Sequence, residues 1–104
     1  MRRTVKVKSR AIYKMGYRAE TKAREILKEW DYTVIRSAKS GGPWDLVGYN
    51  PSQFILIQVK LCRFGRLPSF DSTKKELAKI QVPANAKKEL WVYERYRGFH
   101  YFPV

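Results

Sequence analysis

The most apolar stretch of the chain, residues 54–61, constrains its fold more than any other feature. Its isoleucine and valine residues favour a β-strand, and apolar side chains on both faces predict a central place in a sheet. A turn at residues 50–53, with proline in its second position, precedes it, and residues 45–49 are typical of another strand. The sequence therefore predicts a β-hairpin in which Tyr49 pairs with Phe54.

The segments before this hairpin predict a helix and a further strand. Apolar residues recur at helical spacing between residues 17 and 30, which predicts a helix with one buried face. Residues 33–37 have the β-branched centre of a strand. Residues 39–43 contain two glycines and a proline and are expected to form a loop that leads into the hairpin.

The second half of the chain predicts one more helix and a second hairpin. After a loop over residues 63–71, Thr73 and Glu76 have the spacing of a capping box, which predicts that a short helix begins there. Residues 89–94 and 99–102 are expected to pair as the last hairpin. The resulting order, αβββαββ, predicts a mixed α/β fold with helices packed against a central sheet.

Charge is the strongest compositional signal. The chain has 104 residues, which we expect to form a single domain over residues 1–104, with residues 1–15 as a basic N-terminal arm. It carries 22 lysine and arginine residues against 9 aspartate and glutamate residues, a formal net charge of +13. Such an excess opposes folding by self-repulsion, so it indicates a polyanionic partner, with nucleic acid first. A membrane surface, an acidic protein or solubility alone are the alternatives.

Other compositional features exclude several classes of protein. The longest uninterrupted apolar run, Phe54 to Ile57, is too short to cross a bilayer, and no apolar signal sequence follows the first residues. We therefore expect a cytoplasmic location, or the host-cell cytoplasm for a viral protein. Cys62 and His100 are the single cysteine and histidine, which excludes an intrachain disulfide and a zinc site of these ligands. Cys62 is expected to be a buried, inert thiol.

The predicted hairpin places polar side chains together at one end of the sheet. If Tyr49 pairs with Phe54, Asp45 lies opposite Gln58, and directly opposed side chains share a face about 4.5–5.5 Å apart at Cβ. Lys60 shares that face with Gln58, because strand side chains alternate with period two. Glu20 lies along the edge of the apolar stripe of the first helix, and it would reach the same place if that helix packs on this face.

These residue types suit phosphodiester hydrolysis. That reaction needs a metal that activates water and offsets the charge that builds on the phosphate. Oxygen ligands from Asp45, the Gln58 amide and Glu20 suit Mg²⁺, for which Mn²⁺ is an expected substitute. Lys60 would orient or deprotonate the attacking water. Each residue also has a structural interpretation, since Asp45 could cap a turn, Lys60 could be solvated and Glu20 could pair with Arg24 along the helix.

The spacing of these residues resembles a known family. Four segments carry the likeness, namely Gly16-x-x-Ala19-Glu20, Val34-Ile35-Arg36-Ser37-Ala38-x-Ser40, Asp45-Leu46-Val47 and Ile57-Gln58-Val59-Lys60. Together they resemble the PD-(D/E)xK nuclease superfamily and, within it, the archaeal Holliday-junction resolvases.

The resemblance implies a restriction-endonuclease-like fold and Mg²⁺-dependent cleavage of DNA in recombination or repair. It implies catalytic roles for Glu20, Asp45 and Lys60, a loop serine at Ser40 near the scissile phosphate, and a homodimer that cuts a four-way junction. Two positions depart from the family pattern. Gln58 stands where an acidic residue is usual, which removes one negative charge from the site, and Trp44 separates the Pro-Asp pair.

Basic residues near the predicted site are the candidates for DNA contact. Cationic side chains would neutralise phosphates and make binding depend on salt. Trp44, in the loop beside Asp45, is the best aromatic candidate for contact with DNA. The predicted DNA-binding set is Arg2, Arg3, Lys6, Lys8, Arg10, Lys14, Arg18, Lys39, Trp44, Arg63 and Arg66.

Three hypotheses follow for the function. The first is a metal-dependent, structure-selective DNA endonuclease. The second is a DNA-binding module on the same fold that has lost cleavage because Gln58 replaces an acidic residue. The third is a small basic RNA-binding protein, which accounts for the charge but leaves the register of Asp45, Gln58 and Lys60 unexplained.

Overall fold

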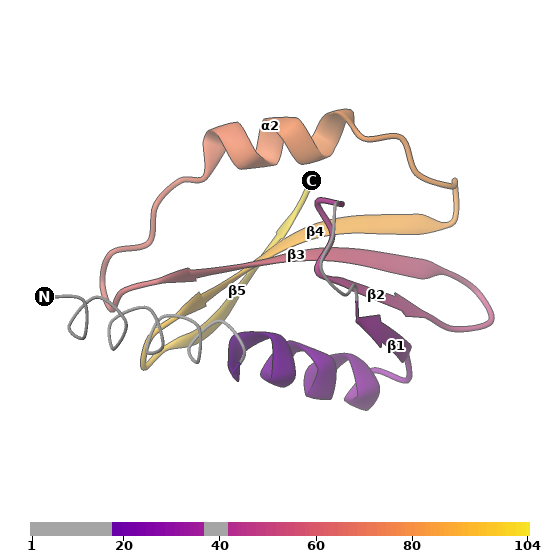
Figure 1. The fold of residues 1–104 in the computed structure, drawn as a ribbon, viewed down its shortest axis with the longest axis horizontal. Helices are drawn as coiled ribbons and strands as arrows, with labels where there is room; N and C mark the ends of the chain where they lie inside the picture. The colour runs from indigo at the N-terminus through magenta and orange to yellow at the C-terminus, as the bar shows by residue number, and fades with distance from the viewer. Residues whose placement is uncertain (1–17, 37–41) are drawn as a thin grey trace, which may run out of the picture.

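A five-stranded mixed sheet forms the centre of the computed structural model, which describes residues 18–36 and 42–104 (Figure 1). The strands follow one another across the sheet in chain order, and every neighbouring pair is antiparallel except β3 and β4, which are parallel. A helix over residues 18–29 precedes the strands. The other elements are β1 (Thr33–Arg36), β2 (Leu46–Tyr49), β3 (Phe54–Cys62), α2 (Asp71–Lys79), β4 (Ala86–Glu94) and β5 (Gly98–Pro103). The predicted element order and mixed α/β class are confirmed.

Strand β3 is central, as its apolar sequence predicts. It pairs with β2 on one side and along its whole length with β4 on the other, from Phe54↔Ala86 to Cys62↔Glu94. A parallel neighbour requires a crossover, and α2 supplies it. Strand β4 begins at Ala86 rather than at Glu89, because the parallel ladder with β3 extends to residues whose own sequence is too polar to indicate a strand.

The two helices cover opposite faces of the sheet, with the helix over residues 18–29 on one side and α2 on the other (Figure 1). Each face has its own core. The first helix packs Ala23 and Leu27 against Leu46, Ile55, Ile57 and Trp91. Helix α2 packs Leu77 against Leu90 and Val92, with Trp44, Cys62 and Phe102 around them. Successive residues of β3 and β4 therefore supply different cores.

The start of α2 differs from the sequence prediction. The helix begins at Asp71, its N-cap residue Phe70 has a left-handed backbone conformation, and no side chain caps the first turn. The predicted capping box of Thr73 and Glu76 is therefore wrong. The aromatic ring of Phe70 packs in the α2-side core, so burial decides where the helix begins. Asp71 in the first turn offsets the helix dipole.

The C-terminal end of α2 is capped from the sheet. The Lys88 ammonium group on β4 donates hydrogen bonds to the carbonyl oxygens of Leu77, Ala78 and Ile80 at 3.0, 2.8 and 2.8 Å. The Leu77 carbonyl also accepts the Ile80 N–H at 3.2 Å. Carbonyls in the last turn of a helix have few donors within the helix, and the positive charge suits the negative end of the dipole. One lysine thus fixes α2 over the face of the sheet that carries Gln58 and Lys60.

The structure bears on the absence of a membrane span and does not describe the predicted basic arm. Of the helices described, neither is long and apolar enough to cross a membrane. The predicted basic arm at residues 1–15 lies outside the described residues.

Candidate active site

The predicted hairpin register is confirmed. Tyr49 pairs with Phe54 and Leu46 with Ile57, so the next step along the hairpin sets Asp45 opposite Gln58. Ile55 and Ile57 are buried under the first helix, and strand alternation turns Gln58 and Lys60 to the other face, beneath α2. Gln58 and Lys60 therefore share a face, as predicted.

Asp45 lies where β2 leaves the sheet, and its carboxylate holds that junction together. Its backbone N–H donates to the Ile57 carbonyl at 2.8 Å. Its side-chain Oδ2 accepts a hydrogen bond at 2.7 Å from the backbone N–H of Val59, one residue beyond Gln58. The carboxylate thus takes the place of a backbone acceptor along the edge of β3 that β2 no longer covers. This bond uses one carboxylate oxygen and leaves the other for a ligand.

Gln58 presents an unusual oxygen. Its side-chain Oε1 is buried and has no hydrogen-bond partner among residues 18–36 and 42–104. In register it lies beside Leu90, whose side chain belongs to the α2-side core. A buried acceptor without a partner costs about 1–3 kcal/mol. An amide oxygen in that state fits a cation, because a hard metal ion supplies the electrostatic partner that the surrounding apolar side chains do not.

Lys60 lies two residues further along β3, half-buried, and pairs in register with Val92. Beyond it, Cys62 pairs with Glu94 at the end of the strand. Cys62 is half-buried rather than fully buried, and burial raises the pKa of its thiol, with the negative charge of Glu94 adding to the rise. A raised thiol pKa agrees with the prediction of an inert cysteine.

The packing condition on which Glu20 was expected to reach the site is not met. The helix that carries it packs on the face of Ile55 and Ile57, opposite to the face of Gln58 and Lys60. The sheet therefore separates the apolar stripe with which Glu20 is aligned from the face of Gln58 and Lys60. A carboxylate on this helix approaches Asp45 only around the edge of β3. For Glu20, the family resemblance remains the basis for a role.

The other predicted site residues divide into two groups. One group lies outside the described residues, namely Ser40, Lys39, Arg2, Arg3, Lys6, Lys8, Arg10 and Lys14. Among the described members, Arg18, Arg63 and Arg66 are exposed. Trp44 is half-buried and packs against the core on the α2 side. Its ring therefore contributes to stability and anchors the loop beside Asp45 to the core.

Sequence reasoning missed a buried carboxylate at this end of the sheet. Glu94 is 2% exposed, and its Oε2 accepts a hydrogen bond from the Gly65 N–H at 2.9 Å. Its Oε1 lies 2.7 Å from Nε2 of His100, and Oε2 lies 3.3 Å from Nε of Arg97. The Gly65 hydrogen bond lowers the pKa of Glu94 below its usual range, and His100 and Arg97 act in the same direction against the opposing effect of burial.

Through these contacts Glu94 connects the loop after β3 with the β4–β5 hairpin. In the sequence, Glu94 ends an apolar strand and is followed by Arg95-Tyr96-Arg97, a pattern typical of an exposed turn. No local signal indicates burial, because its partners Gly65 and His100 come from separate parts of the chain.

The set of acidic ligands near Asp45 is small. Within residues 18–36 and 42–104, no three histidine, cysteine, aspartate or glutamate side chains gather closely enough to hold a metal ion. A metal at this place would therefore have few acidic ligands, which suits Mg²⁺ because this ion takes few protein ligands and keeps several of its waters.

Comparison with known proteins gives a structural match. No family model matches the sequence, and no curated protein matches it either. Among solved structures, the fold is similar to that of Hjc from Archaeoglobus fulgidus, a Holliday junction resolvase from an archaeal hyperthermophile. The TM-score is 0.65 and the identity 24%, over 86% of this chain and 72% of that one. The chain therefore has a restriction-endonuclease-like α/β fold, as the resemblance of its motifs predicts.

Proposed function

We propose that this protein is a metal-dependent endonuclease that cleaves branched DNA, with four-way junctions as its substrate class. The observation that carries the proposal is the Oε1 of Gln58, which is buried opposite Asp45 on the face shared with Lys60 and has no partner in the described part of the chain. The fold similarity to an archaeal Holliday junction resolvase and the net charge of +13 support it.

Asp45 and Gln58 would hold a Mg²⁺ ion, with Mn²⁺ as a substitute. When bound, the metal would lower the pKa of a coordinated water and offset charge on the phosphate. Asp45 is held in place for this by the Val59 N–H, so the carboxylate does not need to be ordered at the moment of binding. The neutral amide of Gln58 gives the site one negative charge fewer than an acidic residue would, which predicts weaker metal affinity.

Lys60 would act on the attacking water and on the phosphate. It lies on the same face as Gln58, one pleat further toward the end of β3, and its ammonium group would offset charge that develops on the phosphate. Glu20 would complete the site around the edge of β3 and Ser40 would contact the scissile phosphate. A homodimer, with each site cutting one strand, would suit the two-fold symmetry of a four-way junction.

A cleavage panel tests the proposal. Labelled linear duplex, flap, four-way junction and single strand are incubated with Mg²⁺, with Mn²⁺ and with EDTA. We expect metal-dependent nicking that is strongest on the junction and is abolished in Asp45→Asn and in Lys60→Ala. Lys87→Ala, an exposed lysine on β4, is the matched control and should cleave normally. Retained cleavage in both site variants would reject the proposal.

The amide at Gln58 supports a second candidate, a DNA-binding module on the same fold without cleavage. It predicts junction binding with no cut under either metal and a gain of cleavage in Gln58→Glu. A competition between RNA duplex and four-way DNA junction separates both from an RNA-binding protein. Preferential binding of RNA would favour the third hypothesis.

A further inference from the structure

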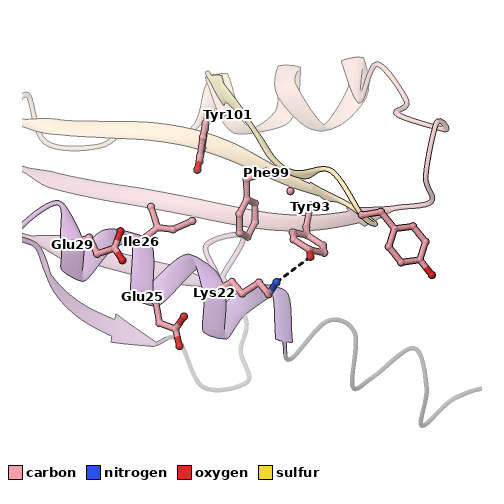
Figure 2. Close-up of a pocket in the computed structure, with 9 residues that line it drawn as sticks. Lys22, Glu25, Ile26, Glu29, Tyr93, Phe99 and Tyr101 are labelled. Carbon is pink, nitrogen blue, oxygen red and sulfur yellow. Dashed lines mark hydrogen bonds between the residues drawn. The ribbon is translucent and has the colours of Figure 1, made fainter.

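A groove opens between the helix over residues 18–29 and the β4–β5 hairpin, on the face of the sheet opposite to Gln58 and Lys60 (Figure 2). It is widely open to solvent, has a volume of about 530 Å³ and continues, through shared walls at Lys22, Tyr93 and Tyr96, into a second hollow of about 350 Å³. Both volumes fall in the range of about 300–1,000 Å³ that is usual for ligand sites. Neither hollow includes the proposed catalytic residues.

Aromatic rings form the sheet side of the groove. Tyr93, Phe99 and Tyr101 project from the hairpin toward the first helix (Figure 2). The rings of Tyr93 and Phe99 lie 5.2 Å apart between centroids, and Phe99 and Tyr101 are stacked at 6.1 Å with 24° between their planes. Tyr96, in the hairpin turn, is 76% exposed. A row of ring faces of this kind accepts flat ligands by stacking.

Positive charge gathers at one end of the groove. Arg18, Lys22 and Arg95 line the smaller hollow, whose lining includes no acidic residue. The Lys22 ammonium lies 3.2 Å from the Tyr93 hydroxyl oxygen and 5.1 Å from the Tyr93 ring centroid, and the Arg95 guanidinium lies 5.0 Å from the Tyr96 ring centroid. The cations are thus held against the same rings that offer stacking.

Negative charge marks the opposite end. Glu25 and Glu29, on the first helix beyond Lys22, line the larger hollow and not the smaller one (Figure 2). A ligand that carries a phosphate would be attracted to the cationic end and repelled from the acidic end. The groove therefore favours one orientation, with an anionic group near Arg18 and Arg95 and neutral flat rings over Tyr96 and Tyr93.

We propose that this groove binds unpaired nucleotides of a DNA single strand, with the bases stacked on Tyr96 and Tyr93 and the phosphates bound by Arg18, Lys22 and Arg95. Flat bases and a chain of phosphates match the two halves of the lining, and a fully paired duplex does not, because its bases are stacked on each other. The net charge of +13 supplies the long-range attraction.

The groove also lies close to the proposed catalytic face. Leu61 lines the cationic hollow, and Lys60 precedes it in β3 with its side chain on the other face. Consecutive Cα atoms are about 3.8 Å apart, so one DNA strand that passes around the end of β3 would contact both places. On the proposed function, the groove would hold nucleotides that are unpaired at a branch point while a nearby phosphate lies at Lys60.

Binding of a fluorescein-labelled, mixed-sequence DNA single strand in EDTA tests the groove without any cleavage. Tyr96 has a φ of 69°, a conformation that asparagine tolerates, so Tyr96→Asn removes the ring without strain. We expect the dissociation constant, measured by anisotropy, to rise about 5- to 150-fold in Tyr96→Asn and to recover in Tyr96→Trp. Tyr49→Thr, which removes an exposed ring at the far end of the sheet, should bind like the wild type.

The charged half is tested by salt. Each phosphate contact to a single strand contributes about 0.7 to the slope of log K against log salt concentration, so Arg95→Gln should lower that slope by about 0.7. Unchanged affinity in Tyr96→Asn, or an unchanged slope in Arg95→Gln, would overturn the proposal. Because these measurements exclude metal, an absence of junction cleavage would reject the proposed function and leave this result standing.

Discussion

The Asp45 carboxylate accepts a hydrogen bond at 2.7 Å from the backbone N–H of Val59, at the point where β2 separates from β3. One side chain thus has a structural task and a proposed catalytic one. The bond explains why the carboxylate stays beside Gln58 although β2 contributes no further pairs. Because of this bond, removing the Asp45 side chain would lower both stability and cleavage, and the two effects could not be distinguished.

The two tasks of Asp45 can be separated by the choice of substitution. Asparagine keeps an oxygen for the Val59 N–H and removes the charge, whereas alanine removes both. We expect Asp45→Ala to lower the free energy of unfolding by about 1–3 kcal/mol and Asp45→Asn to lower it less, while both abolish cleavage. Urea denaturation and junction cleavage measure the two effects. Equal destabilisation by both variants would contradict the hydrogen-bond role.

Gln58 should limit stability in the absence of metal. Its Oε1 is buried without a partner among the residues that the structure describes, so Gln58→Leu in EDTA should raise the free energy of unfolding by about 1–3 kcal/mol. Mg²⁺ should raise the melting temperature of the wild type and leave that of Gln58→Leu unchanged, because a ligand stabilises only the form that binds it. Thermal denaturation with and without the ion measures both.

A second glutamine on the same hairpin serves as the control. Gln53 donates a side-chain hydrogen bond to the Tyr32 hydroxyl, so Gln53→Leu removes a satisfied interaction and should destabilise the protein without affecting the response to Mg²⁺. A Mg²⁺ response that survives in Gln58→Leu would place the ion elsewhere.

Glu94 predicts how stability changes in acid. Its folded-state pKa is lowered, so its contribution is complete above the unfolded pKa of about 4.3 and is lost as the pH falls through the lower folded value. Glu94→Gln should lower the melting temperature at neutral pH and flatten its fall below about pH 4.3. Glu76→Gln, at an exposed carboxylate on α2, should keep the wild-type pH profile. Parallel acid profiles for wild type and Glu94→Gln would contradict this role.

Lys88 should be required for the position of α2. Lys88→Met keeps most of the aliphatic stem and removes the donors to the carbonyls of Leu77, Ala78 and Ile80. We expect a loss of about 1–2 kcal/mol in the free energy of unfolding, measured with urea. Lys87→Met, the exposed neighbour on β4, should change stability little. Equal effects of the two substitutions would show that the cap contributes nothing.

The sequence by itself determined the hairpin and the side chains that share its face. Turn length and the alternation of strand side chains are local properties, so the pairs Tyr49–Phe54 and Leu46–Ile57 and the common face of Gln58 and Lys60 follow without knowledge of any other element. The central place of β3 also follows, because a strand that is apolar on both faces is stable only with both faces covered.

Only the tertiary structure decided which helix covers which face. The apolar stripe that carries Ala23 and Leu27 fits either side of the sheet, and its packing on Ile55 and Ile57 removed the face argument for Glu20. Packing of Phe70 set the start of α2 in place of a capping box, and burial of Glu94 required Gly65 from a distant segment and His100 from the neighbouring strand β5. The spacing of residues along a strand determines which side chains share a face. The free energy of burial depends on partners that only the fold brings together.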